Sequence, residues 1–142
     1  MKLVAVDIGN TNITFGVTEK GNVLGNWRIG TQLWRTEDEH FILFKELLKH
    51  FDEDLNLIQG SVLSCVVPPL KRPVTLALTH LFGNNCVVVE PGIKTGMPVR
   101  YNPASNVGAD RIVNAVAARA EYPYPAIVID FGTATTFCVI DE

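Results

Sequence analysis

Residues 3–17 read LVAVDIGNTNITFGV, two short apolar runs separated by a polar turn. The first run ends at Asp7, and Gly9-Asn10-Thr11-Asn12 supplies the turn chemistry typical of a β-hairpin. A carboxylate buried at a strand end must meet hydrogen-bond donors or a cation, and the N–H groups of a glycine turn can form a concave site for phosphate oxygens. Two interpretations follow: a phosphate-binding hairpin with Asp7 facing a metal ion or its water, or an ordinary hairpin in which Asp7 caps the turn amides.

A second copy of this pattern favours the first interpretation. Residues 126–141 read AIVIDFGTATTFCVID, in which an apolar run is followed by Asp130-Phe131-Gly132-Thr133 and a further apolar run. One short glycine pattern is weak evidence, but two copies predict duplicated halves that each present a phosphate-binding hairpin to a shared cleft. This arrangement resembles the actin, Hsp70 and sugar-kinase superfamily, in which two related domains hold ATP between two such loops.

Composition limits the classes of function. The 142 residues are 47% hydrophobic and 19% charged, with a net charge of −3, so a packed core is expected and long disorder is not. No block of Lys or Arg is present, and charge-driven binding to nucleic acid or to an anionic membrane therefore has no support. The longest apolar runs are too short to span a bilayer.

The cysteines and the start of the sequence point to a cytoplasmic location. Cys65, Cys86 and Cys138 are odd in number, have no C-x-x-C spacing and lie in apolar surroundings, so we expect buried free thiols in a reducing compartment. Met1-Lys2 leads directly into the first strand without the pattern of a signal peptide.

The rest of the first hundred residues alternates strand and helix signals. After the hairpin, the sequence predicts strands at 22–31, 58–67 and 86–89 and helices at 36–51 and 70–82. Pro73 is expected in the first turn of the second helix, where a missing N–H is harmless. The order β-β-β-α-β-α-β predicts an α/β domain with a mixed sheet, like the start of a ribonuclease-H-like domain.

The first of these helices carries a capping signal. Thr36 is the expected N-cap, with Glu39 three residues on completing a capping box. His40 and His50 are expected on the outer side of the helix. Because neither has a Cys or His partner at ligand spacing, we do not expect a metal role for them.

A long loop precedes the third helix. Residues 90–107 are rich in Pro and Gly, and loops of this length in a compact domain are usually functional or mobile. The helix is expected from about Gly108 to Glu121. Asp110 and Arg111 at its start have ordinary interpretations, a dipole interaction and a solvated charge. An arginine at a helix N-terminus also suits an anionic ligand group, and the adjacent carboxylate could accept a hydroxyl proton.

Three blocks carry a family resemblance. The segments DIGNT at 7–11, YNPASNVGADRIVNAVAA at 101–118 and IDFGTATT at 129–136 resemble the type III pantothenate kinases in order and spacing, and the resemblance covers the whole chain. It implies an α/β, ribonuclease-H-like (actin-like ATPase) domain at residues 1–122, with the phosphate hairpin at 7–14 and the substrate loop and helix at 90–122. Residues 123–142 would begin a second, duplicated domain.

The resemblance also implies roles for individual residues. Asp110 would be the catalytic proton acceptor, and Arg111 would bind the pantothenate carboxylate. Asp7 would lie on the Mg²⁺ side of the site, directly or through water, and Asp130 would bind a monovalent cation, K⁺ or NH₄⁺. The ATP-binding residues would be Asp7, Ile8, Gly9, Asn10, Thr11, Asn12, Ile13, Thr14 and Thr133, and the substrate-binding residues Tyr101, Gly108, Ala109, Asp110 and Arg111.

The implied activity is phosphorylation of pantothenate by ATP to 4′-phosphopantothenate, the first step of coenzyme A biosynthesis, by a cytoplasmic homodimer. Family members continue for roughly as long again after residue 142, so the resemblance implies an N-terminal half whose activity alone is doubtful. Two alternatives stay open: a transcriptional accessory protein of the same family, and a non-catalytic nucleotide-binding module of the actin or Hsp70 kind. The latter would not need Tyr101 or the run from Gly108 to Arg111.

Overall fold

The computed structural model describes residues 1–50 and 57–141. Phe51, the expected last residue of the first helix, lies outside the described residues. The chain forms two compact units, Met1–Val88 and Val89–Glu142, and each is described by itself.

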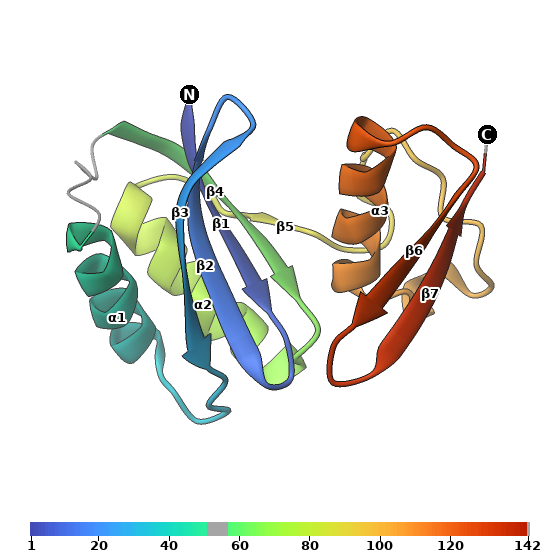
Figure 1. Cartoon of the computed structure of the whole chain (residues 1–142). Coiled ribbons are helices and arrows are strands. Elements are labelled where there is room, and N and C mark those ends of the chain that lie inside the picture. The colour runs from blue at the N-terminus through green and yellow to red at the C-terminus, as the bar shows by residue number, and fades with distance from the viewer. Residues whose placement is uncertain (51–56, 142) are drawn as a thin grey trace. The chain divides into compact units, whose positions relative to one another are not determined.

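The first unit is built on a five-stranded mixed sheet (Figure 1). Its elements are β1 (Lys2–Ile8), β2 (Asn12–Glu19), β3 (Asn22–Gly30), α1 (Glu37–Lys49), β4 (Ile58–Cys65), α2 (Pro68–Phe82) and β5 (Val87–Val88). The strand order is β3-β2-β1-β4-β5. The β3–β2 and β2–β1 pairs are antiparallel, and the β1–β4 and β4–β5 pairs are parallel. The predicted order of elements and the mixed sheet are confirmed.

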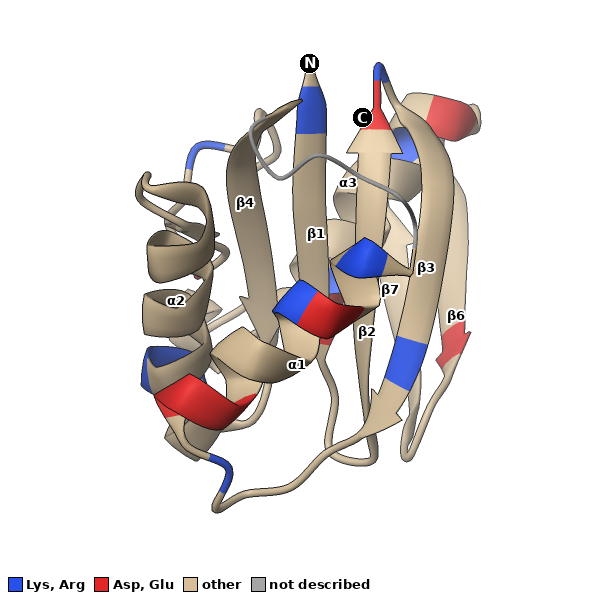
Figure 2. Ribbon diagram, turned by 90° about the vertical axis from the view of Figure 1, so that its left-hand side faces the viewer, with Lys and Arg blue, Asp and Glu red and all other residues tan. Residues whose placement is uncertain are grey.

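Both helices of this unit pack on the same face of the sheet. Figure 2 shows α1 in front of the strands and α2 beside β4. Val4, Val6 and Ile8 of β1 share one buried cluster with Phe44 and Leu48 of α1. Because side chains alternate along a strand, Asp7 lies on the opposite face of β1.

The start of α1 is as predicted, but one of its histidines is not. Thr36 accepts a hydrogen bond from the Glu39 N–H, and the Glu39 carboxylate accepts one from the Thr36 N–H at 2.7 Å, which completes the capping box. His50 is exposed. The expectation of an outward His40 is wrong: its side chain is fully buried beside Phe44, with the ring centroids 5.5 Å apart. His40 lies four residues before Phe44 and therefore falls on the core face of the helix.

The second helix begins earlier than predicted. Pro68 takes the first helical position, where a proline N–H is not needed, so Pro73 lies inside the helix rather than in its first turn. Gly83 ends the helix in the left-handed conformation, at φ 65°, which glycine adopts without steric penalty. The helix face predicted to be apolar supplies buried Leu70, Val74 and Leu78.

The second unit consists of a loop, one helix and one hairpin. A short 3₁₀ helix (Ala104–Asn106) leads into α3 (Ala109–Glu121), which packs against the antiparallel pair β6 (Ala126–Phe131) and β7 (Thr135–Ile140). The predicted helix and second hairpin are confirmed. This grouping places α3 with the hairpin, whereas the sequence suggested a domain boundary after residue 122. Compact units do not by themselves define domains, so that boundary stays a prediction.

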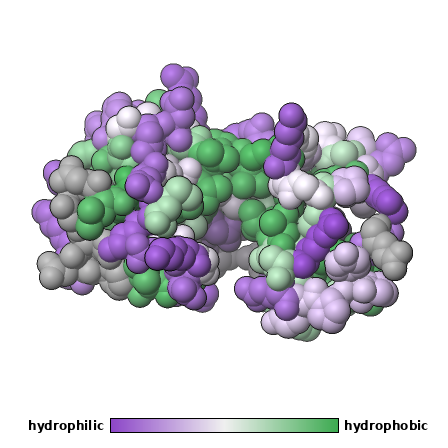
Figure 3. All heavy atoms as spheres, turned by 90° about the horizontal axis from the view of Figure 1, so that it is seen from above, coloured by the Kyte–Doolittle hydropathy of each residue, from purple (hydrophilic) through white to green (hydrophobic). Residues whose placement is uncertain are grey.

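The face of the β6–β7 hairpin that points away from α3 is apolar. Hydrophobic residues reach the surface on the side of the molecule drawn in Figure 3. On the hairpin, the exposed large apolar residues alternate with half-buried ones along each strand: Ile127, Ile129, Phe131, Phe137 and Val139. Ile127 faces Val139 and Ile129 faces Phe137 across the ladder, so these side chains form one continuous apolar surface.

The three cysteines are free thiols, but each is half-buried rather than buried. Burial raises the pKa of the Cys65 and Cys86 thiols, which disfavours their thiolates. Among the described residues, no helix is long and apolar enough to cross a membrane.

Candidate functional site

The tip of the first hairpin is held by its neighbouring strand. Gly9 N–H donates to the Asn12 carbonyl at 2.9 Å and so closes the turn. Thr31, directly after β3, donates its hydroxyl to the Gly9 carbonyl at 2.7 Å and its N–H to the Thr11 carbonyl at 3.0 Å. Sequence reasoning missed Thr31 because its contacts join residues about twenty positions apart.

Gly9 allows a close approach of the backbone within this turn. A Cβ at position 9 would stand 3.3 Å from the Asn12 carbonyl oxygen, a distance tighter than most real Cβ contacts. A residue with a Cβ would therefore shift the Asn12 carbonyl by a few tenths of an ångström. The compact loop that results is the one expected to hold phosphate oxygens.

Asp7 is the second-to-last residue of β1, close to the turn, and it lies beside two residues that carry hydroxyl groups. It pairs in register with Thr14 on β2 and with Ser64 on β4. The sequence suggested a buried carboxylate, but Asp7 is exposed because it lies on the sheet face away from α1 and α2. An exposed carboxylate at this edge is accessible to a hydrated metal ion.

In the second unit, Arg111 and Tyr101 come together. The Arg111 guanidinium carbon lies 5.7 Å from the centre of the Tyr101 ring. Its Nε donates to Cys138 Sγ at 3.0 Å and its Nη2 to the Phe137 carbonyl at 3.2 Å. The contact with Cys138 is the main cause that raises the pKa of Arg111. The guanidinium is thus a fixed cation at the start of α3.

These two residues line a cavity of about 580 Å³. Two more arginines, Arg100 and Arg119, line it as well. Arg100 pairs with Asp141 at 3.1 Å, and Arg119 contacts the Gly96 carbonyl at 3.4 Å. The volume is typical of a small-molecule site, and the arginines favour a ligand with an anionic group.

Asp110 is the first acidic residue of α3 and is half-buried. Its Oδ1 accepts a hydrogen bond from the Arg111 N–H at 2.8 Å. Gly108, the N-cap, has no side chain that could accept hydrogen bonds from the first amides of the helix. The Asp110 carboxylate satisfies one of these amides, that of Arg111. Gly108 is half-buried and Ala109 is buried at the same helix start.

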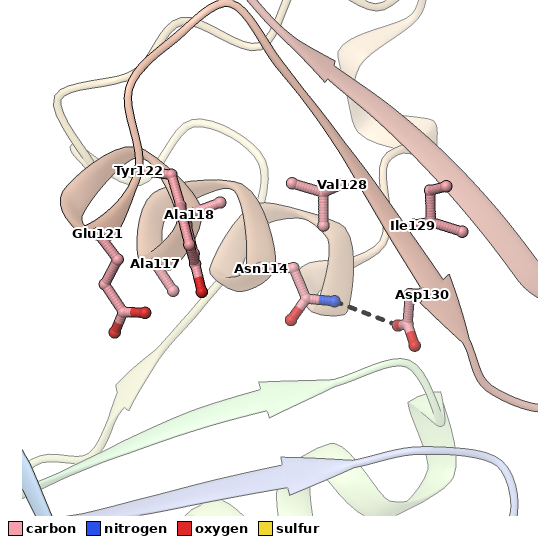
Figure 4. A pocket seen from close by; sticks show the side chains of 8 residues that line it. All are labelled: Asn114, Ala117, Ala118, Glu121, Tyr122, Val128, Ile129 and Asp130. Atoms are coloured by element: carbon pink, nitrogen blue, oxygen red, sulfur yellow. Dashed lines mark hydrogen bonds between the residues drawn. The ribbon is translucent and has the colours of Figure 1, made fainter.

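Asp130, the aspartate of the second hairpin, is hydrogen-bonded to α3 (Figure 4). Asn114 Nδ2 donates to Asp130 Oδ2 at 3.1 Å. The pair lines a cavity of about 350 Å³ together with Ala117, Ala118, Glu121, Tyr122, Val128 and Ile129. Sequence reasoning missed Asn114, although its position four residues after Asp110 places it one turn further along the same face of α3.

The structure therefore brings together part of the predicted site. Tyr101, Gly108, Ala109, Asp110 and Arg111 cluster at the start of α3, and Thr133 lies in the turn after Asp130. The other predicted ATP-binding residues are contiguous around the first turn.

The donor atoms fit the expected ions to different degrees. Among residues 1–50 and 57–141, no group of three or more His, Cys, Asp or Glu side chains could hold a metal ion. Mg²⁺ commonly binds through one or two carboxylates and the substrate phosphates, so Asp7 alone is compatible with it. At Asp130, Gly132 leaves room beside Oδ1, since a Cβ there would stand 3.8 Å away.

Comparison with known proteins assigns the family. The sequence profile of the type III pantothenate kinases matches residues 3–142. The chain belongs to the type III pantothenate kinase family. The resemblance seen in the three sequence blocks is thereby confirmed.

Individual family members agree with the profile. A type III pantothenate kinase from Exiguobacterium sp. is 44% identical over 140 residues, covering 99% of this chain and 55% of the relative. One from Moorella thermoacetica is 45% identical over 140 residues, with the same coverage. The chain thus spans about half the length of the curated relatives that it matches.

A solved structure supports the fold. The Ppx/GppA phosphatase of Aquifex aeolicus aligns with a TM-score of 0.51 at 13% identity, covering 99% of this chain and 48% of that chain. Together with the mixed sheet and its helices, this likeness supports the predicted α/β fold of the actin-like ATPase class for this member of the type III pantothenate kinase family.

Proposed function

We propose that this chain supplies the phosphate hairpin and the pantothenate pocket of an ATP-dependent pantothenate kinase. The enzyme transfers the γ-phosphoryl group of ATP to the primary hydroxyl of pantothenate and gives 4′-phosphopantothenate, the first step of coenzyme A biosynthesis. The observation that carries the proposal is the fixed Arg111 guanidinium over Tyr101, beside a 580 Å³ cavity and next in sequence to Asp110.

Arg111 binds the pantothenate carboxylate in this proposal. A guanidinium held at Nε and Nη2 by Cys138 and Phe137 has lost most of its rotamer freedom before the substrate arrives. Pairing with a carboxylate then requires little further ordering. The rest of pantothenate, a neutral chain with hydroxyl groups, occupies the cavity that Tyr101 lines.

Asp110 accepts the proton of the substrate hydroxyl. Its Oδ1 is bound to the Arg111 N–H, which orients the carboxylate, and its other oxygen is the one that we assign to the proton. The primary hydroxyl and the carboxylate are at opposite ends of pantothenate, so in this proposal Asp110 and Arg111 hold the two ends of the substrate at one helix start. Phosphoryl transfer otherwise depends mainly on positioning and on neutralisation of charge.

The phosphates of ATP are held by the turn at residues 7–14 and by Thr133. Asp7 holds Mg²⁺, directly or through water, and Asp130 holds K⁺ or NH₄⁺. When bound, these ions neutralise negative charge on the phosphates. The turn contributes a backbone fixed by Gly9 and Thr31.

Two other functions are less well supported. A transcriptional accessory role or a non-catalytic nucleotide-binding module would not require the arrangement of Tyr101, Asp110 and Arg111, and the relatives described above are named as kinases. A homodimer joined through the Ala117–Ala118 part of α3 and a cytoplasmic location remain predictions.

The test is a coupled phosphorylation assay on the full-length gene product with ATP, pantothenate, Mg²⁺ and KCl. The Arg111→Ala variant is expected to raise the KM for pantothenate at least tenfold with a smaller change in kcat, because a charged partner of the bound substrate is lost. Arg72→Ala, which removes an exposed arginine on α2, is the matched control and should leave both constants unchanged. Absence of pantothenate phosphorylation by the wild-type protein, or an unchanged KM in Arg111→Ala, would contradict the proposal.

A further inference from the structure

The polar side chain of Asn114 lies on α3. None of the roles proposed above is assigned to it. It is half-buried, and its amide nitrogen donates to Asp130 Oδ2 at 3.1 Å (Figure 4). It lies on the same face of the helix as Asp110, one turn further on. A single hydrogen bond therefore connects the helix that carries the proton acceptor with the strand that carries the cation ligand.

The two oxygens of Asp130 have different surroundings. Oδ2 is bound to Asn114, whereas Oδ1 lies toward the turn after β6, 3.8 Å from where a Cβ of Gly132 would stand. That turn is closed by a hydrogen bond of 3.2 Å from the Gly132 N–H to the Ala134 carbonyl, and it carries Thr133. A carboxylate free to rotate about its side-chain bonds would not keep one oxygen on the turn side.

We propose that Asn114 is a positioning residue that holds Asp130 in one orientation, with Oδ1 available to a monovalent cation beside the turn at residues 132–134. The inference rests on the proposed function, because it concerns the cation assigned to Asp130. Residues that orient a metal ligand commonly change metal affinity by about ten- to a hundredfold when they are replaced. Asn114 acts on the cation through Asp130 in this account and does not touch the reacting atoms.

The main variant is Asn114→Ala in the full-length gene product. Alanine is the residue most favourable to a helix, so α3 is expected to form. We expect the KCl concentration for half-maximal turnover to rise about ten- to a hundredfold, while kcat at saturating KCl stays near that of the wild type. An unchanged KCl requirement would overturn the inference.

A second readout does not depend on turnover. The midpoint of thermal unfolding is measured as KCl replaces tetramethylammonium chloride at constant ionic strength. A cation that binds the folded state raises this midpoint, and the KCl concentration needed for the rise should increase in Asn114→Ala by the same factor as the kinetic requirement. If the two measurements disagree, so that only turnover changes, the effect is not on cation binding and the inference is wrong.

Two further variants separate positioning from simple structure or charge. Glu121→Gln removes a carboxylate from the wall of the same cavity and should leave the KCl requirement unchanged. The exchanged pair Asn114→Asp with Asp130→Asn can re-form an amide–carboxylate hydrogen bond between α3 and β6. It should recover the unfolding midpoint measured without KCl but not the wild-type response to KCl. An equal effect of Glu121→Gln, or full recovery of the KCl response by the exchanged pair, would overturn the inference.

The outcomes also distinguish this inference from the proposed function. A wild-type protein that neither phosphorylates pantothenate nor responds to KCl contradicts the proposed function, and the inference falls with it. A wild-type protein that does both, with an Asn114→Ala variant of unchanged KCl requirement, contradicts the inference alone.

Discussion

The two units of the chain bury apolar side chains to very different extents. In the first unit, Phe15, Phe44 and Leu48 are completely inaccessible to solvent and belong to one cluster. In the second unit, Phe131 and Val139 of the hairpin remain 81% and 76% exposed. The first unit thus carries a core of its own, whereas the proposed substrate-binding and catalytic side chains are concentrated on a smaller unit with an apolar outer face. Surfaces of this kind usually mark a contact site.

The largest expected effect is on the core of the first unit. Phe44→Ala removes a ring stacked on Phe15, with centroids 4.8 Å apart, and should lower the free energy of unfolding by about 3–5 kcal/mol. Urea denaturation followed by Trp27 fluorescence, with Trp34 replaced by Phe, reports on this region, because the centres of the Trp27 and Phe15 rings lie 5.9 Å apart.

The matched change in the second unit is Phe131→Ala. Its exposed ring should contribute less than about 0.5 kcal/mol to the free energy of unfolding, and its removal should reduce binding of a hydrophobic dye. A loss of stability equal to that of Phe44→Ala would mean that the hairpin surface is part of the core, and the contrast between the units would be wrong.

The buried His40 gives the first unit a pH dependence. Burial, and to a lesser extent the charge of Arg35, lowers the pKa of His40 from 6.5 to about 4. Since the folded-state pKa is below the unfolded one, stability present above pH 6.5 is lost as the pH falls toward 4. A shift of this size corresponds to about 3 kcal/mol at most. Urea denaturation at a series of pH values measures it.

The control for this prediction is His40→Leu. Neither ring nitrogen of His40 has a hydrogen-bond partner in the part of the chain that the structure describes, so an apolar replacement should be neutral or stabilising. It should also flatten the dependence of stability on pH between 6.5 and 5, a range above that in which most carboxylates titrate. A dependence that persists in His40→Leu would assign it to another group.

Much of the fold could be predicted from short-range signals. The capping box at Thr36 and the repeated hairpin pattern at Asp7 and Asp130 each depend on residues a few positions apart, and these predictions hold. The prediction for His40 fails because its spacing of four residues from Phe44, and not its polar residue type, determines the face of the helix on which it lies. Thr31 and Asn114 could not be found in this way, since their partners Gly9 and Asp130 lie 22 and 16 positions away in sequence.

Changes at the helix starts of the two units are expected to be smaller than those at Phe44 and His40. Thr36→Ala removes the capping box of α1 and should lower stability by about 1 kcal/mol. Gly108→Ser adds a capping hydroxyl to α3, whose N-cap has no side-chain hydrogen bond, and should change stability by only a few tenths of a kcal/mol. Thermal unfolding of both variants compares the two helix starts. If Gly108→Ser stabilised the protein by as much as Thr36→Ala destabilised it, the start of α3 would lack as much capping stabilisation as the capping box gives to α1.

The central claim is that the start of α3 carries the chemistry of pantothenate phosphorylation, and Asp110→Asn tests it most directly. The substitution keeps the size of the side chain and an oxygen that can accept the Arg111 N–H, but it removes the basic carboxylate. Turnover and pantothenate affinity are measured on the full-length gene product. We predict that kcat falls by about 10² to 10⁴ while the affinity for pantothenate changes little. Wild-type turnover with a loss of affinity alone would contradict the account, because Asp110 would then be a binding residue.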